Sequence, residues 1–439
     1  MSIRHFTWLV VAAAPVAVRP VPLHAQAIPE ITLEEALRRS RIVSPGVIGA
    51  QGSLRNAELS TSAAIWQFIP SLSFQPQANL ALSSGQSRID PVTQEVISGN
   101  QSNPSFGFGL NASYTVFDGF ARNHALSGQR ANERAAAAGL INAQAASDYV
   151  TTSAYFAVLT RVHVVSVAEG NLEAAESQLR LASAKLHSGS GRVTDSLTAL
   201  GGYQQATLAL LQARSDAAVS QSALGRLVGI SGRMNAIDDP AYHTTPVPLD
   251  TAAIRQQVLT TGPDIVTLTA NLASAQQFYQ GTKTGYLPTL DVTAFSNWTG
   301  NDASNYSLVA RRGLNLQLSI SPWTNMARER SIESASISVS NAEAALADAR
   351  NSLYAQIDQV FASLAVAQTA IGVSQGAVES GTLNLRLVTE QYRSGVSNVS
   401  ELVTATQQLA AAQASEVTAR FSYLLAKALL ESLVGHRVR

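Results

Sequence analysis

Apolar and polar residues alternate along several segments of the chain. In GFGLNASYTV (107–116), phenylalanine, leucine, alanine, tyrosine and valine occupy every second position, with small polar residues and glycine between them. This period of two is typical of a strand with one apolar and one polar face. SLSFQPQANLALS (71–83) and GLNLQLSI (313–320) alternate in the same way, and residues 289–300 alternate less clearly. The pattern predicts four strands of about ten residues, which suit either a transmembrane barrel or a soluble sandwich.

The alternation stops at Asp118-Gly119, and a very long helix is predicted to follow. No proline occurs from Phe120 to His187, a stretch of 68 residues that would extend roughly 100 Å as a helix. Apolar and small residues recur there at heptad spacing, and the spacing returns near the C-terminus, which predicts coiled coils. The positions are Leu172, Ala175, Leu179, Ala182 and Leu186, then Val378, Gly381, Leu385, Val388 and Tyr392. Two shorter helices, predicted at 33–68 and 193–228, would stack end to end along the long one.

The sequence contains an internal duplication. LHSGSGRVTDSLTAL begins at Leu186 and YRSGVSNVSELVTAT begins 206 residues later at Tyr392, whereas IPSLSF and LPTLDV lie 218 residues apart. The difference predicts a longer hairpin loop in the first half, near Ser84–Asn103, where Ser, Gly, Asn and Pro are frequent. Each half is predicted to contain a helix, two strands, a long helix and a final helix. The predicted parts are the repeats 28–230 and 251–435, a linker at 231–250 and a tail at 436–439.

Local signals predict the boundaries of the first helix in each half. Thr32, with Glu35 three residues later, forms a capping box, and the second copy is predicted to begin after Asp250. Pro70 and Pro288 are predicted to end these helices and begin the strands, because proline lacks the backbone N–H and restricts the residue before it.

The N-terminus resembles a secretory signal. Arg4 and His5 precede an apolar stretch of 11 residues, Trp8 to Val18, and Ala25-Gln26-Ala27 fits a small-residue cleavage site. We predict a signal peptide at 1–27, with a disordered N-terminus as the alternative. There is no cysteine, so disulfides, cysteine-ligated metals and a lipid on an N-terminal cysteine are excluded. No later run of 18 apolar residues was found, so no membrane-spanning helix is expected.

Charge and motifs give no sign of catalysis or nucleic-acid binding. Basic and acidic residues number 30 each, and charged residues make up only 14% of the chain, so no basic field points to nucleic acid. The seven histidines are dispersed without ligand spacing, which predicts no metal site. GSG at 189–191 lacks the context of a phosphate loop, and no nucleophile elbow is present. We therefore expect neither an enzyme nor a cofactor.

Several of these segments, in order and in duplicate, resemble the TolC family of outer-membrane channel proteins. They are ITLEEAL at the first helix, IPSLSF and LPTLDV before strands, YTVFDGFAR after a strand, and RSGVSNVSELVTATQQLAAAQ at a helical turn, within about 30–435. The resemblance implies a mainly α fold with four strands per chain. Three chains would share a twelve-stranded transmembrane barrel, and their helices would form a tunnel across the periplasm.

The resemblance also implies a function and partners. Such proteins are the passive outer-membrane exit duct of a tripartite efflux or type I secretion system. They are homotrimers embedded in outer-membrane lipid, and they dock onto a periplasmic adaptor protein and an inner-membrane transporter. The alternative is a structural coiled-coil protein of the cell envelope without channel activity. Drugs, metals or polypeptides are possible cargo, and the sequence does not separate small-molecule efflux from polypeptide secretion.

In this family the turns GSGRVTD and GVSNVSE would lie at the periplasmic tip. Gly189 and Gly395 would allow the chain to reverse, and with Arg192 and Ser397 they would form the adaptor-docking turns. The residues implied at the aperture are Asp195, Glu401, Tyr392 and Thr194. The two carboxylates would line the constriction, and the tyrosine would tie neighbouring helices together. In the plainer interpretation, Thr194 or Ser400 caps a helix and the adjacent acid favours the helix dipole.

Departures from the family pattern occur at the second tip turn and at the second strand-to-helix junction. Ser397 replaces an arginine of the family's inter-chain lock, for which Arg192 or Arg393 could substitute. Gly119 is predicted to turn the chain from strand to helix, whereas the second junction reads SPWTN and contains Pro322. Trp323 and Phe117 are predicted either at the inner bilayer interface or in the core.

Overall fold

A computed structural model describes residues 28–82, 88–89, 92–94, 96–97, 102–243, 251–300 and 307–434. The predicted signal peptide, the C-terminal tail, much of the predicted hairpin loop and the end of the predicted linker lie outside the described residues.

The first half of the chain runs from a short strand through two short helices to the sheet and then into a helical hairpin. Its main elements are β1 (Glu30–Ile31), α1 (Leu33–Val43), α2 (Pro45–Trp66), β2 (Ser71–Leu82), β5 (Ser102–Phe117), α3 (Ala121–His187) and α4 (Val193–Leu227). Two-residue strands β3 (Arg88–Ile89) and β4 (Val96–Ile97) pair with each other between β2 and β5. The strand β6 (Asn235–Ala236) and a short 3-10 helix, η1 (Pro240–His243), follow α4.

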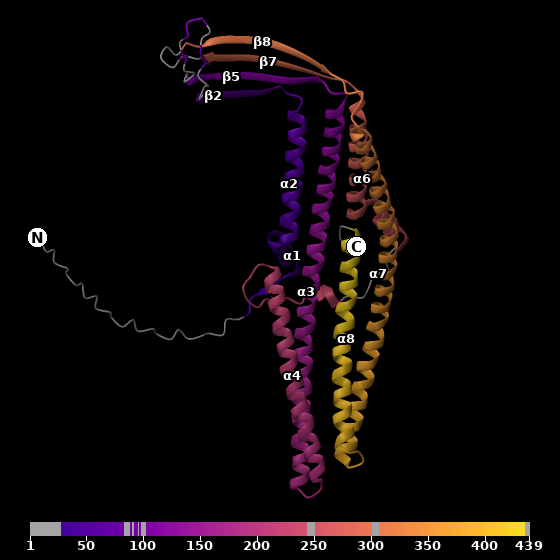
Figure 1. The fold of residues 1–439 in the computed structure, drawn as a ribbon. Helices are drawn as coiled ribbons and strands as arrows, with labels where there is room; N and C mark the ends of the chain where they lie inside the picture. The colour runs from indigo at the N-terminus through magenta and orange to yellow at the C-terminus, as the bar shows by residue number, and fades with distance from the viewer. Residues whose placement is uncertain are drawn as a thin grey trace, which may run out of the picture.

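The second half repeats this order. It contains α5 (Thr251–Thr261), α6 (Pro263–Lys283), η2 (Thr284–Tyr286), β7 (Thr289–Gly300), β8 (Val309–Ser319), α7 (Ala327–Ser394) and α8 (Val399–Val434). In Figure 1 the hairpins α3–α4 and α7–α8 extend away from the sheet, and α2 and α6 extend towards it. The two short helices therefore lie along the long one, as the lengths predicted.

The first helix of each half is broken, and our prediction of one continuous helix at 33–68 is wrong in this respect. α1 ends at Val43 and α2 begins at Pro45, with Ser44 at φ −58° and ψ 120° between them. A proline disfavours helical geometry at the preceding residue, which accounts for the break. Gly262-Pro263 separates α5 from α6 in the same way, with Gly262 at ψ 136°. The predicted cap at the start is present, because Thr32 Oγ1 accepts from the Glu35 N–H at 3.4 Å.

The long helices match the prediction closely, with 67 residues in α3 and 68 in α7. By length and composition alone, each of these helices contains a stretch apolar enough to cross a membrane. We did not expect such a stretch from the sequence, because we searched for an uninterrupted run of apolar residues. The alanines that allow close helix packing also raise the hydropathy of these stretches. Each helix is roughly 100 Å long, about three times a bilayer core.

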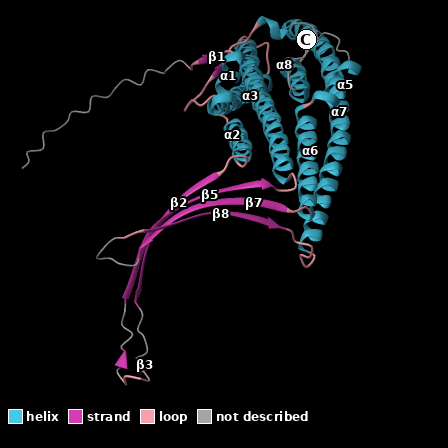
Figure 2. Cartoon of the chain, turned by 90° about the horizontal axis from the view of Figure 1, so that it is seen from above, coloured by secondary structure: helices cyan, strands magenta, loops and turns pink. Residues whose placement is uncertain are grey.

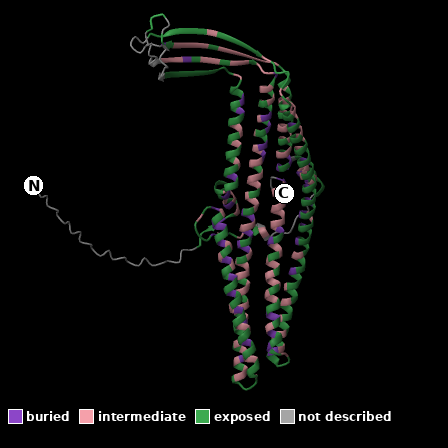
Figure 3. Ribbon diagram, viewed as in Figure 1, coloured by how far each residue is buried: buried purple, intermediate pink, exposed green. Residues whose placement is uncertain are grey.

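Strands β2, β5, β7 and β8 form one antiparallel sheet in that order. The sheet curves away to one side of the helices as a blade (Figures 1 and 2). Its apolar face is strongly exposed, with Leu72 at 75%, Leu314 at 73% and Leu318 at 69%, and Figure 3 shows no layer covering it. The regular pairing of β5 with β7 is interrupted at Val116. Thr115 pairs with Asp291 and Phe117 with Leu290, so Val116 is an extra residue that forms a bulge.

Buried apolar side chains of the described helices form three clusters along their length. One joins α5 and α6 to α7 and α8 around Ile357 and Leu430, and another surrounds Tyr155 of α3 at mid-length. There the Tyr155 hydroxyl donates to the Ile237 carbonyl at 2.6 Å, beside the parallel pair β1–β6. The third cluster lies at the far end of the hairpins, at the predicted tip.

Candidate functional site

The turn between α3 and α4 contains the predicted Gly189 and Arg192. Gly189 has φ +75°, and the N–H groups of Ser190 and Gly191 donate back to the Lys185 carbonyl at 3.0 and 2.9 Å. This geometry ends the helix and reverses the chain, and the left-handed conformation favours glycine. Arg192 is exposed as the N-cap residue of α4, without a side-chain cap.

The turn between α7 and α8 is built around Gly395 and Asn398. Gly395 has φ +82°, and the Asn398 side-chain oxygen accepts from the Glu401 N–H at 2.9 Å. The Glu401 carboxylate in turn accepts from Asn398 at 3.0 Å and from the Ser397 hydroxyl at 2.5 Å. The prediction that Thr194 or Ser400 caps a helix is therefore wrong, because Asn398 caps α8 by Asx geometry and both residues lie inside their helices.

Tyr392 is 3% exposed in the tip cluster, and the buried residues around it come from α3, α4 and α8. They are Ala182, Ala199, Val399 and Leu402. Burial raises the pKa of the tyrosine, and the nearby Asp195 carboxylate raises this pKa further. One side chain thus contacts the helices of both hairpins, as a tie between them requires, while Thr194 is exposed and Asp195 is half-buried.

Lys185 forms a second connection between the hairpins, which the sequence did not reveal. Its ammonium lies 4.3 Å from the centre of the Tyr392 ring and donates to the Tyr392 carbonyl and, at 3.4 Å, to the Arg393 carbonyl. These carbonyls lie at the C-terminal end of α7, where the helix dipole stabilises a positive charge. The ring of Tyr392 stabilises the same charge by a cation–π contact.

Two other charged residues at the tip, Arg393 and Glu401, are bonded within their own segments. Arg393 donates to Glu390 at 2.9 Å, and Glu401 is held by the Ser397 and Asn398 side chains. Ser397, which stands where the resemblance implies an arginine, thus donates a hydrogen bond to Glu401 of its own turn. Among the described residues, no group of three or more His, Asp or Glu side chains is arranged to hold a metal ion.

At the other end of the helices, both strand-to-helix junctions use two left-handed residues in succession. Gly119 and Phe120 have φ +66° and +68°, and Asn325 and Met326, 206 residues later, have φ +48° and +65°. Glycine and asparagine adopt this conformation most readily. A Cβ at Gly119 would lie 2.8 Å from the Leu287 Cβ, so close packing also requires this glycine.

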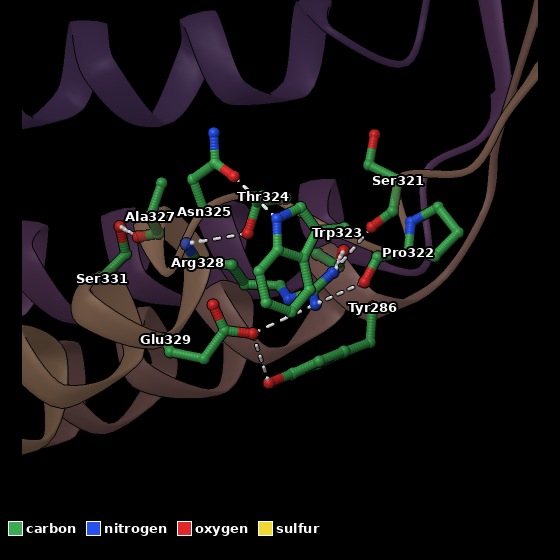
Figure 4. Close-up of polar contacts among 11 residues, drawn as sticks. Tyr286, Ser321, Pro322, Trp323, Thr324, Asn325, Ala327, Arg328, Glu329 and Ser331 are labelled. Atoms are coloured by element: carbon green, nitrogen blue, oxygen red, sulfur yellow. Dashed lines mark hydrogen bonds and ion pairs between the residues drawn. The ribbon is translucent and has the colours of Figure 1, made fainter.

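Arg328 joins the second junction to the end of α6. Its guanidinium lies 3.7 Å from the centre of the Tyr286 ring and donates to the carbonyls of Gly285 at 3.3 Å and Ser321 at 2.9 Å (Figure 4). Glu329 completes the group, since its carboxylate accepts from Arg328 at 3.1 Å and from the Tyr286 hydroxyl at 3.2 Å. The pKa of Glu329 is lowered, first by its own backbone N–H and then by Arg328.

Arg122 holds the equivalent place in the first half. It pairs with Asp118 at 2.9 Å, donates to the Gln67 carbonyl at 3.2 Å and lies 5.0 Å from the centre of the Phe68 ring. Ala121-Arg122 and Ala327-Arg328 lie 206 residues apart in the sequence, but this repetition does not predict the contacts of either arginine. We call Arg122 and Arg328 the junction arginines.

The predicted junction residues lie where strands meet helices. Pro70 and Pro288 directly precede β2 and β7. The helix α2 ends at Trp66, two residues before the predicted end at 68, and α6 ends at Lys283, where the short helix η2 follows. Pro322 lies between β8 and α7, with its carbonyl facing Arg328 (Figure 4). Trp323 is 78% exposed, so the alternative of core packing is wrong for this residue, and Phe117 packs edge-on against Phe120.

Comparison with known proteins identifies the family. The sequence profile of the outer membrane efflux protein family matches residues 50–230 and 254–436. The chain belongs to this family. The resemblance to TolC-type channels is thereby confirmed.

Two relatives align with most of this chain. CyaE of Bordetella pertussis is 24% identical over 409 residues, which cover 90% of this chain and 81% of CyaE. The outer membrane efflux protein BepC of Brucella suis is 23% identical over 336 residues, covering 74% of this chain and 71% of BepC. The crystal structure of the outer membrane protein VceC from Vibrio cholerae has a TM-score of 0.77 at 17% identity, covering 93% of this chain and 97% of VceC. At that identity the likeness concerns the fold.

Membership of the outer membrane efflux protein family also bears on two alternatives from the sequence. The family and the fold are those of channel proteins rather than of enzymes. The match extends over both halves of the chain, so a structural coiled-coil protein without channel activity is no longer needed to explain the long helices.

Proposed function

We propose that three copies of this chain form a passive duct, with a shared twelve-stranded barrel in the outer membrane and a helical tunnel in the periplasm. The observation that carries this proposal is the sheet β2–β5–β7–β8, which has two unpaired edges and an exposed apolar face. An open edge and an uncovered apolar face are both unfavourable in water. Closing four-stranded sheets into one barrel within lipid removes both costs.

The polar face of the sheet supports an aqueous interior. It carries Ser73, Asn111, Asn315 and Gln317, and its carboxylate Asp291 accepts from the Thr115 hydroxyl at 2.6 Å. The helices α3 and α7, with 67 and 68 residues, are long enough to extend far below the membrane. We place energy and selection in an inner-membrane transporter, which a periplasmic adaptor connects to the tip turns at Gly189 and Gly395.

The absence of cysteine allows a direct test of assembly. Ser73→Cys on β2, combined with a cysteine at Asn315, Gln317 or Ser319 on β8, gives disulfides between chains only if these edges meet. We expect a ladder ending at the trimer on a non-reducing gel of outer-membrane fractions, and steady conductance of the purified trimer in planar bilayers. A chain that remains monomeric in buffer without detergent and forms no pores would contradict the proposal.

The cargo is a separate question, and efflux is the first candidate because BepC is named an efflux protein. A deletion strain should then become more sensitive to drugs or metals, and the wild-type gene should restore resistance. Unchanged resistance, together with loss of a secreted polypeptide, would instead assign the duct to type I secretion.

A further inference from the structure

One charged residue lies on the apolar face of the sheet. Along β8, Arg312 shares a face with Leu314, Leu316 and Leu318, and it is exposed like them. In a membrane barrel this face contacts lipid, and an arginine at the bilayer midplane costs about 2–4 kcal/mol. Near an interface the cost falls towards zero, so the height of Arg312 decides what the residue does.

Arg312 on β8 stands at the end of a row of three aromatic rings on β2, β5 and β7, so the rings and the arginine together cross all four strands. Its guanidinium lies 5.9 Å from the centre of the Trp298 ring on β7, which stacks on Phe108 of β5 at 4.7 Å. Phe108 in turn lies 6.0 Å from Phe74 of β2. Aromatic rings in a band around a barrel are typical of the boundary between lipid tails and headgroups.

The register places this row at the boundary farther from the helices. Ile320, just beyond the helix end of β8, and Arg312 are eight residues apart, about 27 Å along an antiparallel strand. A strand tilt of about 40° reduces this to about 20 Å across the bilayer, and the apolar band of such barrels is about 25 Å tall. Because the helices lie on the periplasmic side, the row faces the headgroups of the outer leaflet.

No carboxylate of the sheet neutralises Arg312. Asp291 is the single acidic residue in β2, β5, β7 and β8, and it lies on the polar face, bonded to Thr115. No ion pair of Arg312 is present among the described residues, and its neighbour on the facing strand is the uncharged Ser296. The guanidinium therefore keeps donors for an anion outside the chain.

We propose that Arg312, beside Trp298, binds a phosphate group of an outer-leaflet lipid headgroup, with the lipid's acyl chains lying on the apolar face below it. This inference rests on the proposed function, because it requires the sheet to stand in the outer membrane. Arginine suits phosphate through paired hydrogen bonds. Trp298 lies opposite Ala310 and therefore farther from the helices than Arg312, so the contact of the guanidinium with this ring directs the charge outward to the interface.

The test compares lipids that differ only in phosphate. Purified trimer in detergent is titrated with bisphosphorylated lipid A, with dephosphorylated lipid A and with inorganic phosphate, and bound lipid is measured by native mass spectrometry. We expect binding of the phosphorylated lipid alone, and we expect Arg312→Gln to weaken it about tenfold. Arg311→Gln is the matched control, since Arg311 is the adjacent residue, is also exposed and lies on the polar face.

Each alternative result would overturn the inference. Equal binding of the two lipid A forms would mean that acyl chains alone are recognised, and equal loss in both variants would mean unspecific charge attraction. Competition by inorganic phosphate at comparable concentration would assign the site to a free anion. Failure of the proposed function would look different, because the wild-type chain would then form neither trimers nor pores in planar bilayers.

Discussion

Arg122 and Arg328 make the same two contacts in the two halves of the chain, although they lie 206 residues apart. Arg122 bonds the carbonyl of Gln67 and lies over the ring of the next residue, and Arg328 does the same at Gly285 and Tyr286. Each junction arginine thus ties the start of a long helix to the segment that leads from a short helix into the sheet. The junction arginines connect the long helices to the segments just before β2 and β7 in both halves of the chain.

Replacing a junction arginine should destabilise the protein. The side chains of Arg122 and Asp118 are only 14% and 16% exposed, so Arg122→Ala leaves a half-buried carboxylate without its partner. We expect a loss of about 2 kcal/mol in the free energy of unfolding, measured by urea denaturation in detergent. Arg122→Lys should recover only part of this, because lysine lacks the planar fork.

Arg180→Ala is the control for the junction variants. Its ion pair with Glu176 is 65% and 50% exposed, and such surface pairs contribute less than about 1 kcal/mol. Equal effects of Arg122→Ala and Arg180→Ala would argue against a positioning role for the junction arginines.

Alanine substitutions at two glycines should distinguish the cost of backbone strain from the cost of a steric clash. Gly119 and Gly189 have similar positive φ values, +66° and +75°, but a Cβ at Gly189 would meet nothing within 4 Å. Gly189→Ala should therefore cost about 1 kcal/mol from conformation alone, whereas Gly119→Ala should cost clearly more because Leu287 must move. Thermal unfolding of the two variants measures the difference, and similar melting temperatures would refute the close-packing argument.

The contact between Lys185 and the end of α7 should hold the two hairpins together. Lys185→Met keeps the length of the side chain but removes the donors to the Tyr392 and Arg393 carbonyls. We expect faster amide hydrogen exchange in the turn after Tyr392 and higher conductance in planar bilayers. Arg180→Met, on the same helix but bonded within it, should change neither quantity, and an unchanged exchange rate in Lys185→Met would remove the proposed connection.

The tip should lose stability in alkali. Burial and Asp195 raise the pKa of Tyr392 above its ordinary value of 10.0, so the folded chain holds the phenolic proton more tightly than the unfolded chain. The corresponding stability is complete below pH 10 and is lost as the pH rises through the folded pKa. Denaturation at pH 9 and pH 11 should show a larger decrease for the wild type than for Tyr392→Phe, and parallel decreases would contradict this account.

The acidic residues at the tip should govern ion flow. Three chains would place Asp195 and Glu401 in a ring that favours cations and can bind divalent ions. We expect the double variant Asp195→Asn, Glu401→Gln to show higher conductance and weaker cation selectivity in planar bilayers. Glu176→Gln serves as control, because Glu176 is an exposed acid of α3 that lies farther from the tip. Unchanged conductance and selectivity in the double variant would count against an aperture at this ring.

Several features of the fold could be read from local patterns because each depends on neighbouring residues. The period of two in residues 107–116 reflects a strand whose faces meet different solvents, and the proline-free stretch to His187 reflects one uninterrupted helix. Gly189 and Gly395 were recognisable because few other residues adopt a left-handed turn. The proline at Pro45 could also have predicted the break between α1 and α2. We instead predicted one helix through this position.

The sequence by itself determined the duplicated order of strands and helices, the length of the two long helices, the reversing turns and the family. These properties follow from backbone preferences and from hydrophobic periodicity, which act within one segment. Only the tertiary structure decided that Lys185 meets α7, that the junction arginines meet the ends of α2 and α6, and that Arg312 closes an aromatic row. Those contacts join residues far apart in the chain, and their geometry depends on how the elements pack, which no local pattern records.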